Sequence, residues 1–89
     1  MQTIWITGGS SGIGFATAKE FINNNWQVVI SSSNKIKLES AKKKLELNSN
    51  KNLVHAIVCD ISSKNNVDDT INSIEKNIGK IDIALLNAS

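Results

Sequence analysis

Apolar positions along the chain fall into two alternating patterns. Short continuous apolar runs predict strands at 4–7, 27–31, 53–59 and 81–86. The stretches between them, in which apolar side chains recur every three or four residues, predict helices at 15–24, 35–48 and 63–78. Asn25 stands where a left-handed residue would end the first helix, and Gly79 stands at the end of the third. Strands and helices therefore alternate without interruption.

A glycine-rich turn joins the first strand to the first helix, with the sequence Thr7-Gly8-Gly9-Ser10-Ser11-Gly12-Ile13-Gly14. Glycines at 8, 12 and 14 suit a backbone that turns sharply, approaches a diphosphate and packs closely on the strand. The helix start adds unpaired N–H groups and partial positive charge, and the two serine hydroxyls can donate to phosphate or ribose oxygens. A turn without a ligand is the alternative, but it would not require three glycines and two serines here. We therefore expect a nucleotide at this turn.

The alternation predicts an α/β fold of Rossmann type, with a parallel sheet between two helix layers. For a chain that begins with a nucleotide-binding turn, the expected strand order is 3-2-1-4, which is part of a doubly wound sheet. The near-continuous apolar run at 53–59 is expected to be buried on both faces. Residues 1–89 would then form a single, partial dinucleotide-binding domain.

The composition of the chain argues against several classes of function. Ten lysines against eight acidic residues leave a net charge of only +2, and the cluster Lys42–Lys44 lies near Glu39 and Glu46, so a solvated helix face is favoured over nucleic-acid binding. Long apolar segments are missing and the first strand begins near Met1, so we expect no membrane partner, no signal peptide and a cytoplasmic location. The single cysteine, Cys59, is expected to pack as a small apolar side chain. No metal site is predicted.

These residues together resemble the amino-terminal part of the short-chain dehydrogenase/reductase family, whose signature T-G-x-x-x-G-x-G follows the first strand. Thr7 to Gly14 match that signature, and the spacing favours the oxidoreductase branch of the family. Cys59-Asp60-Ile61 resembles the end of the family's third strand, where an aspartate accepts a hydrogen bond from the adenine amino group. Asn87-Ala88 resembles part of the family's N-N-A-G motif, although Leu86 and Ser89 replace the first Asn and the final Gly.

The glycine-rich turn and the resemblance together predict cofactor contacts at the ends of all four strands. The predicted cofactor-binding residues are Gly8, Ser10, Ser11, Gly12, Ile13, Gly14, Ser32, Ser33, Asn34, Asp60, Ile61, Asn87, Ala88 and Ser89.

Asp60 has a structural alternative as a cap for the third helix, although Ser62 could fill that role. His55, the only histidine, is expected to be a surface or edge residue rather than a catalytic group.

The end of the second strand bears on the choice of cofactor. Ser31-Ser32-Ser33-Asn34 contains no acid that would bind the ribose hydroxyls of NAD and repel a 2′-phosphate. Lys35 and Lys37 follow directly, so NADP is favoured over NAD. Neither Ser33 nor Ser11, where a basic residue commonly marks NADP use in the family, is charged, so the discrimination can be weak.

The resemblance implies hydride chemistry by a Ser and a Tyr-x-x-x-Lys pair, with the Tyr as general acid or base. The chain contains no Tyr, so no catalytic residue is assigned. We favour a piece of a longer oxidoreductase that acts on a small carbonyl or alcohol substrate, inactive alone and able to form a homo-oligomer. The alternative is a non-catalytic dinucleotide-binding module or pseudoenzyme. In a piece of a longer chain, the fourth strand would present an open edge.

Overall fold

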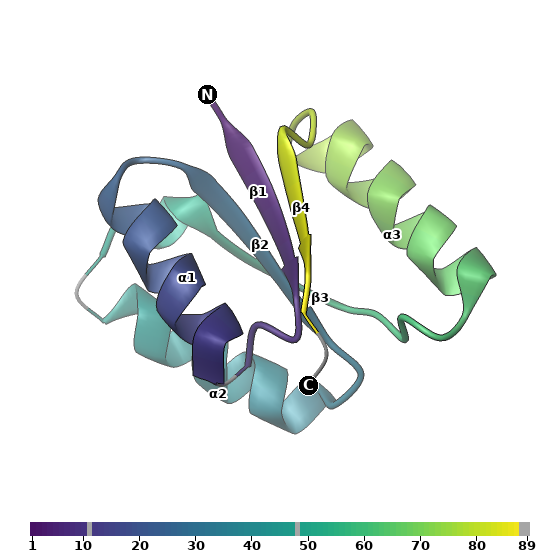
Figure 1. Cartoon of the computed structure of the whole chain (residues 1–89). Coiled ribbons are helices and arrows are strands. Elements are labelled where there is room, and N and C mark those ends of the chain that lie inside the picture. Colours follow the sequence, from purple (N-terminus) through teal and green to yellow (C-terminus); the bar gives the residue numbers. More distant parts are fainter. Residues whose placement is uncertain (11, 48, 88–89) are drawn as a thin grey trace.

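The computed structural model describes residues 1–10, 12–47 and 49–87, and the expected strands and helices all form (Figure 1). In chain order they are β1 (Thr3–Thr7), α1 (Gly12–Asn23), β2 (Gln27–Ser32), α2 (Lys35–Glu46), the 3-10 turn η1 (Lys51–Leu53), β3 (Val54–Val58), α3 (Lys64–Asn77) and β4 (Ile83–Leu86). Helix α1 begins at Gly12, three residues before the start that apolar spacing predicted, because the helix already begins inside the glycine-rich turn.

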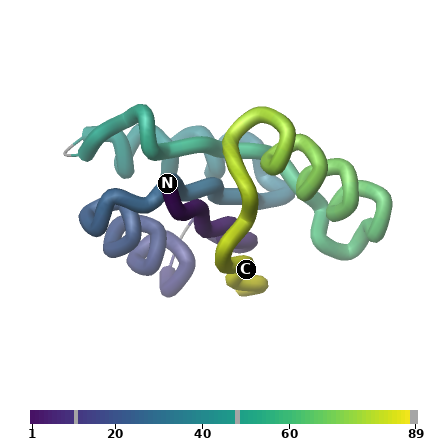
Figure 2. Tube along the Cα trace, turned by 90° about the horizontal axis from the view of Figure 1, so that it is seen from above, coloured from purple at the N-terminus to yellow at the C-terminus, as the bar shows by residue number. Residues whose placement is uncertain are grey.

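The strands form one parallel sheet in the order β3-β2-β1-β4, which confirms the predicted topology. Helices α1 and α2 cover one face of the sheet and α3 covers the other, as Figures 1 and 2 show. The result is a three-layer α/β fold of Rossmann type. Among the described helices, none combines the length and the apolar character needed to cross a membrane.

Alternation of side chains along the central strands divides the core in two. Ile4 and Ile6 of β1 point toward α1 and α2 and belong to the larger apolar cluster. Trp5, between them, points to the other face and packs with Val29, Cys59 and Ile74 under α3. The expectation that Cys59 packs as an apolar side chain is confirmed, since it is a buried free cysteine in that smaller cluster.

Both outer strands of the sheet are partly exposed. In β3, only Val54 is buried, and Val58 is 45% exposed, so the expectation of burial on both faces was wrong. The reason is position: β3 is an edge strand and, within the described residues, pairs only with β2. Strand β4 lies at the opposite edge and pairs only with β1 within the described residues, with Leu86 64% exposed. That edge is open in the described structure.

Caps account for most of the helix boundaries. Asn25 follows α1 with a φ of 65°, which confirms the expected left-handed cap. Asn34 caps α2 by accepting a bond from the Lys37 N–H at 3.0 Å. Helix α3 is capped by Ser63, not by Ser62 or Asp60. Gly79 follows the end of α3, where its N–H donates to the carbonyl of Ile74.

Candidate functional site

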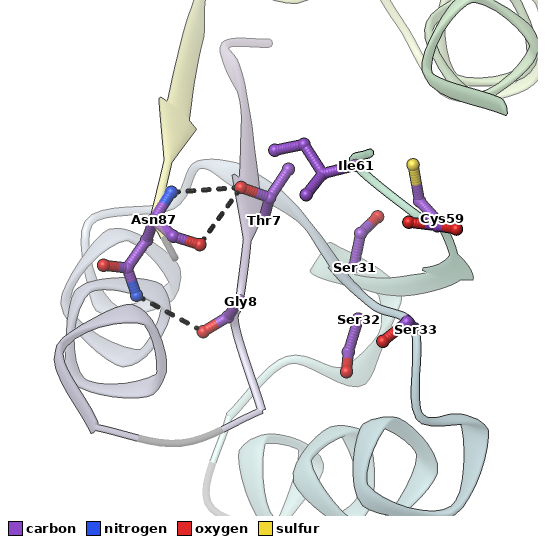
Figure 3. Close-up of a pocket in the computed structure, with 9 residues that line it drawn as sticks. Thr7, Gly8, Ser31, Ser32, Ser33, Cys59, Ile61 and Asn87 are labelled. Carbon is purple, nitrogen blue, oxygen red and sulfur yellow. Dashed lines mark hydrogen bonds between the residues drawn. The ribbon is translucent and has the colours of Figure 1, made fainter. Parts of the chain in front are cut away.

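The carboxyl ends of all four strands border one hollow, shown in Figure 3. Its lining comprises Thr7, Gly8, Ser31, Ser32, Ser33, Cys59, Asp60, Ile61 and Asn87. We call this hollow the crevice. In parallel α/β sheets, ligands bind outside the carboxyl ends of the strands where neighbouring connections run to opposite faces. Here the connection after β1 leads to α1 on one face of the sheet, and the connection after β3 leads to α3 on the other.

The structure brings six of the predicted cofactor residues to the crevice. Gly8, Ser32, Ser33, Asp60, Ile61 and Asn87 line it. Gly12, Ile13 and Gly14 form the first turn of α1, Ser10 lies in the preceding turn, and Asn34 caps α2. Ser11, Ala88 and Ser89 lie outside the described residues.

The glycine-rich turn leaves no space for side chains at two positions and has unusual backbone angles at two others. Gly8 and Gly12 have φ values of 69° and 61°, in the left-handed region that favours glycine. A Cβ on Gly14 would lie 2.3 Å from the carbonyl oxygen of Gly8. A Cβ on Gly9 would lie 2.7 Å from Cγ2 of Ile30. The start of α1 therefore packs directly against the backbone that leaves β1.

Hydrogen bonds hold this turn against strand β2. The N–H groups of Gly8 and Gly9 donate to the carbonyl of Ser31 at 2.8 and 3.3 Å. The Ser31 hydroxyl in turn accepts a bond from the buried indole N–H of Trp5 at 2.9 Å. Ser31 therefore ties the turn to the core under α3.

Thr7 and Asn87 join the two walls of the crevice (Figure 3). The Asn87 N–H donates to Oγ1 of Thr7 at 3.0 Å, and the Asn87 amide Nδ2 lies 3.5 Å from the carbonyl oxygen of Gly8. The Thr7 hydroxyl has the carbonyls of Leu85 and Asn87 within 3.5 Å as acceptors. One threonine side chain thus bridges the ends of β1 and β4, and the side chain of Asn87 lies beside the glycine-rich turn.

The loop after β3 presents an ionised carboxylate to the crevice. Oδ1 of Asp60 accepts bonds from the hydroxyl and the backbone N–H of Ser62, at 2.6 and 3.0 Å. These bonds, the hydroxyl bond first, lower the pKa of the Asp60 carboxyl below its ordinary value. The side chain of Asn66 in α3 accepts a bond from the backbone N–H of Asp60 and orients the loop.

The family model for short chain dehydrogenases matches residues 2–89. This chain belongs to the short-chain dehydrogenase family. Two relatives illustrate the match. The 17-beta-hydroxysteroid dehydrogenase type 3 of Danio rerio is 42% identical over 81 residues, which are 91% of this chain and 25% of that protein. A protein of Yarrowia lipolytica named probable NADP-dependent mannitol dehydrogenase is 40% identical over 86 residues, covering 93% of this chain and 29% of its own.

Solved structures agree with the sequence matches. Salutaridine reductase from Papaver somniferum superposes with a TM-score of 0.89 at 30% identity, and the match covers 100% of this chain and 30% of that one. This short-chain dehydrogenase chain thus spans about a quarter to a third of the length of the relatives it matches.

Other features of this short-chain dehydrogenase chain lie away from the crevice. His55 is half-buried in the edge strand β3, as the sequence predicted, and its Nε2 lies 3.2 Å from Oε1 of Gln27. Burial, and secondarily the charge of Lys42, lower the pKa of the His55 imidazole. Within the residues that the structure describes, no group of His, Cys, Asp and Glu side chains could hold a metal ion.

Removing the Ser62 hydroxyl should raise the pKa of Asp60 toward its ordinary value. In the native protein the lowered pKa keeps the carboxylate ionised to lower pH, and that acceptor is lost only as the pH falls through the lowered value. Carbon-13 NMR titration of the Asp60 carboxyl in the native protein and in the Ser62→Ala variant measures the difference. Identical titration curves would show that the bond in the structure does not persist in solution.

Proposed function

We propose that the crevice binds the adenosine-diphosphate half of a nicotinamide dinucleotide, and that the chain is the cofactor-binding portion of an oxidoreductase. The observation that carries this proposal is the contact at Gly14, where a Cβ would meet the Gly8 carbonyl at 2.3 Å. A plain strand-to-helix connection does not require backbone packed on backbone in this way. Such close packing is required where a phosphate must approach the N–H groups at a helix start.

The residues present fit the parts of such a cofactor. The first turn of α1 contains no acidic residue, so its N–H groups and partial positive charge are available to a diphosphate. The Asp60 carboxylate supplies an acceptor for the adenine amino group, and the half-exposed side chain of Ile61 supplies apolar surface beside it. Asn87 forms the opposite wall. When bound, the cofactor supplies the nicotinamide ring that accepts or donates hydride.

NADP is the preferred cofactor in this proposal. Ser32 and Ser33 line the crevice at the end of β2, where no carboxylate is present to bind ribose hydroxyls or repel a 2′-phosphate. The Yarrowia lipolytica relative is named as NADP-dependent, which supports the same preference.

Replacing Ser33 with aspartate should shift the preference toward NAD. A carboxylate at the end of β2 can accept bonds from both ribose hydroxyls and would repel a 2′-phosphate. The ratio of the NADH and NADPH dissociation constants, measured by titration calorimetry, should fall by at least about tenfold, the factor that corresponds to ~1.4 kcal/mol. An Asn72→Asp variant adds the same charge on the exposed surface of α3 and should leave the ratio unchanged. A ratio that stays constant in S33D would show that β2 does not set the preference.

A second candidate function is a non-catalytic dinucleotide-binding module, favoured by the absence of tyrosine from these 89 residues. Titration with NADPH tests the binding that both candidates share, and a folded chain that binds neither NADPH nor NADH would overturn both. The coding sequence beyond Ser89 separates them. A continuing frame that encodes Tyr-x-x-x-Lys supports hydride transfer to or from a carbonyl or alcohol substrate, whereas a stop codon supports the module.

A further inference from the structure

The loop that carries Asp60 is anchored at both of its ends. Cys59 and Asp60 line the crevice where the chain leaves β3. The N–H of Cys59 donates to the carbonyl of Ser32 at 3.1 Å, which fixes one end of the loop to β2. The N–H of Asp60 donates to the side-chain oxygen of Asn66, and its carbonyl accepts a bond from the Ser63 N–H at 3.1 Å. Both backbone groups of Asp60 are therefore held by the start of α3.

The position of Asn66 is itself fixed by several bonds. Its N–H donates to Oγ of Ser63, the cap of the helix, at 3.2 Å. Its carbonyl accepts a bond at 2.8 Å from the hydroxyl of Thr70, which is only 3% exposed. The thiol of Cys59 lies 4.0 Å from the same carbonyl. Because a backbone N–H can only donate, the Asn66 amide must present its oxygen to Asp60. Asn66 therefore joins the loop to the buried side of α3.

The two oxygens of the Asp60 carboxylate differ in their surroundings. Oδ1 accepts both bonds from Ser62, whereas no residue that the structure describes donates to Oδ2. Asp60 is exposed, so Oδ2 is available to a donor on a ligand. The exocyclic amino group of adenine is such a donor. Hypoxanthine has a carbonyl oxygen in its place, which cannot donate to a carboxylate.

We propose that Asn66 is a positioning residue that sets the base preference of the crevice, adenine over hypoxanthine, by holding the backbone of Asp60. The inference rests on the proposed function, since it requires adenine to lie beside Asp60. Asn66 acts through Asp60 and does not contact the cofactor. Without the Asn66 acceptor, the Asp60 N–H must bond to water, and the loop loses its bond to the side of α3. The carboxylate is then no longer held where it reaches the amino group.

Titration calorimetry with two ligands measures the base preference. The ligands are NADPH and its analogue with hypoxanthine in place of adenine, which differ only at the edge of the base that carries the amino group. The native protein should bind NADPH more tightly. In Asn66→Ala the preference should fall about fivefold, as expected for the net loss of one hydrogen bond, because the affinity for NADPH falls and that for the analogue does not.

Three further variants separate positioning from a general effect on the fold, which would weaken both ligands equally. Asn66→Asp keeps an oxygen acceptor at the same distance from the backbone and should retain most of the preference. Asn66→Leu is similar in size but has no acceptor, so it should reproduce the fall, and it serves as the second test if N66A melts below the temperature of the titration. Asn65→Ala is the matched control, at the neighbouring exposed position of the same helix, and should leave the preference unchanged.

A double variant distinguishes action through Asp60 from direct contact with the base. Asp60→Ala alone should remove the preference, and adding N66A should change it no further. A preference that persists in N66A and N66L, or that falls further when N66A is added to D60A, would overturn the role of Asn66 and leave the proposed function intact. Equal binding of the two ligands by the native protein would do the same. A folded native chain that binds neither ligand would overturn the proposed function, and this inference with it.

Discussion

Replacing Gly14 with valine should abolish dinucleotide binding, with a loss of affinity of at least about a hundredfold, or ~2.7 kcal/mol. The new Cβ would lie 2.3 Å from the Gly8 carbonyl oxygen and 3.1 Å from the Asn87 amide nitrogen. The first of these neighbours is backbone, which cannot move aside by changing a rotamer. The turn and the start of α1 must therefore separate, which moves the N–H groups away from the position where they would bind a diphosphate. Titration of the variant with NADPH measures the loss.

Gly79→Ala is a suitable control for that experiment. Its Cβ would lie 3.3 Å from Oγ1 of Thr3, so it tests a modest steric change at a glycine outside the crevice. Circular dichroism should show that both variants remain folded. Gly12→Ala offers an intermediate case, because its Cβ meets nothing within 4 Å and only the φ of 61° opposes it. NADPH affinity that is the same in G14V and in the native protein would remove the proposed site.

Truncating Ile30 to alanine should lower the melting temperature by about 8–40 °C. Ile30 is 0% exposed in the larger apolar cluster, and truncation of such a side chain costs about 2–5 kcal/mol. For a domain of this size each kcal/mol shifts the midpoint by roughly 4–8 °C. Ile30 also supports the glycine-rich turn, since its Cγ2 occupies the space beside Gly9. Thermal unfolding followed by circular dichroism measures the shift, and NADPH affinity should fall in the fraction that remains folded.

Leu47→Ala provides the comparison, because Leu47 is 77% exposed and its truncation should change the stability by no more than about 0.5 kcal/mol. Equal shifts in the two variants would contradict the burial of Ile30 between β2 and the α1–α2 layer.

Much of the fold follows from patterns that are local in the sequence. Apolar spacing predicted every strand and helix, and alternation predicted the sheet order that the structure confirms. The cap at Asn25 is equally local, because it depends on one residue that tolerates a positive φ. Burial of β3 was not predictable in this way. An apolar run shows that a strand is able to be buried. Whether it is buried depends on which strands and helices pack beside it.

The glycines of the candidate site could be predicted from the sequence, but their partners could not. The reason for glycine at position 9 is the side chain of Ile30, which the fold alone brings there. The support that Asn66 gives to Asp60 likewise depends on how α3 begins. A polar side chain in the first turn of a helix that follows a candidate binding residue is the signal that could have identified it.

The bridge between Thr7 and Asn87 has a consequence for synthesis of the chain. It joins residues 80 positions apart, so one wall of the crevice leaves the ribosome among the first residues and the other only after residue 87. Until then the central strand β1 lacks its second neighbour, and long-range pairing of this kind is slow to form. A ligand that needs the complete crevice therefore cannot stabilise earlier nascent chains, whose stability during translation depends on β1, β2, β3 and the helices already made.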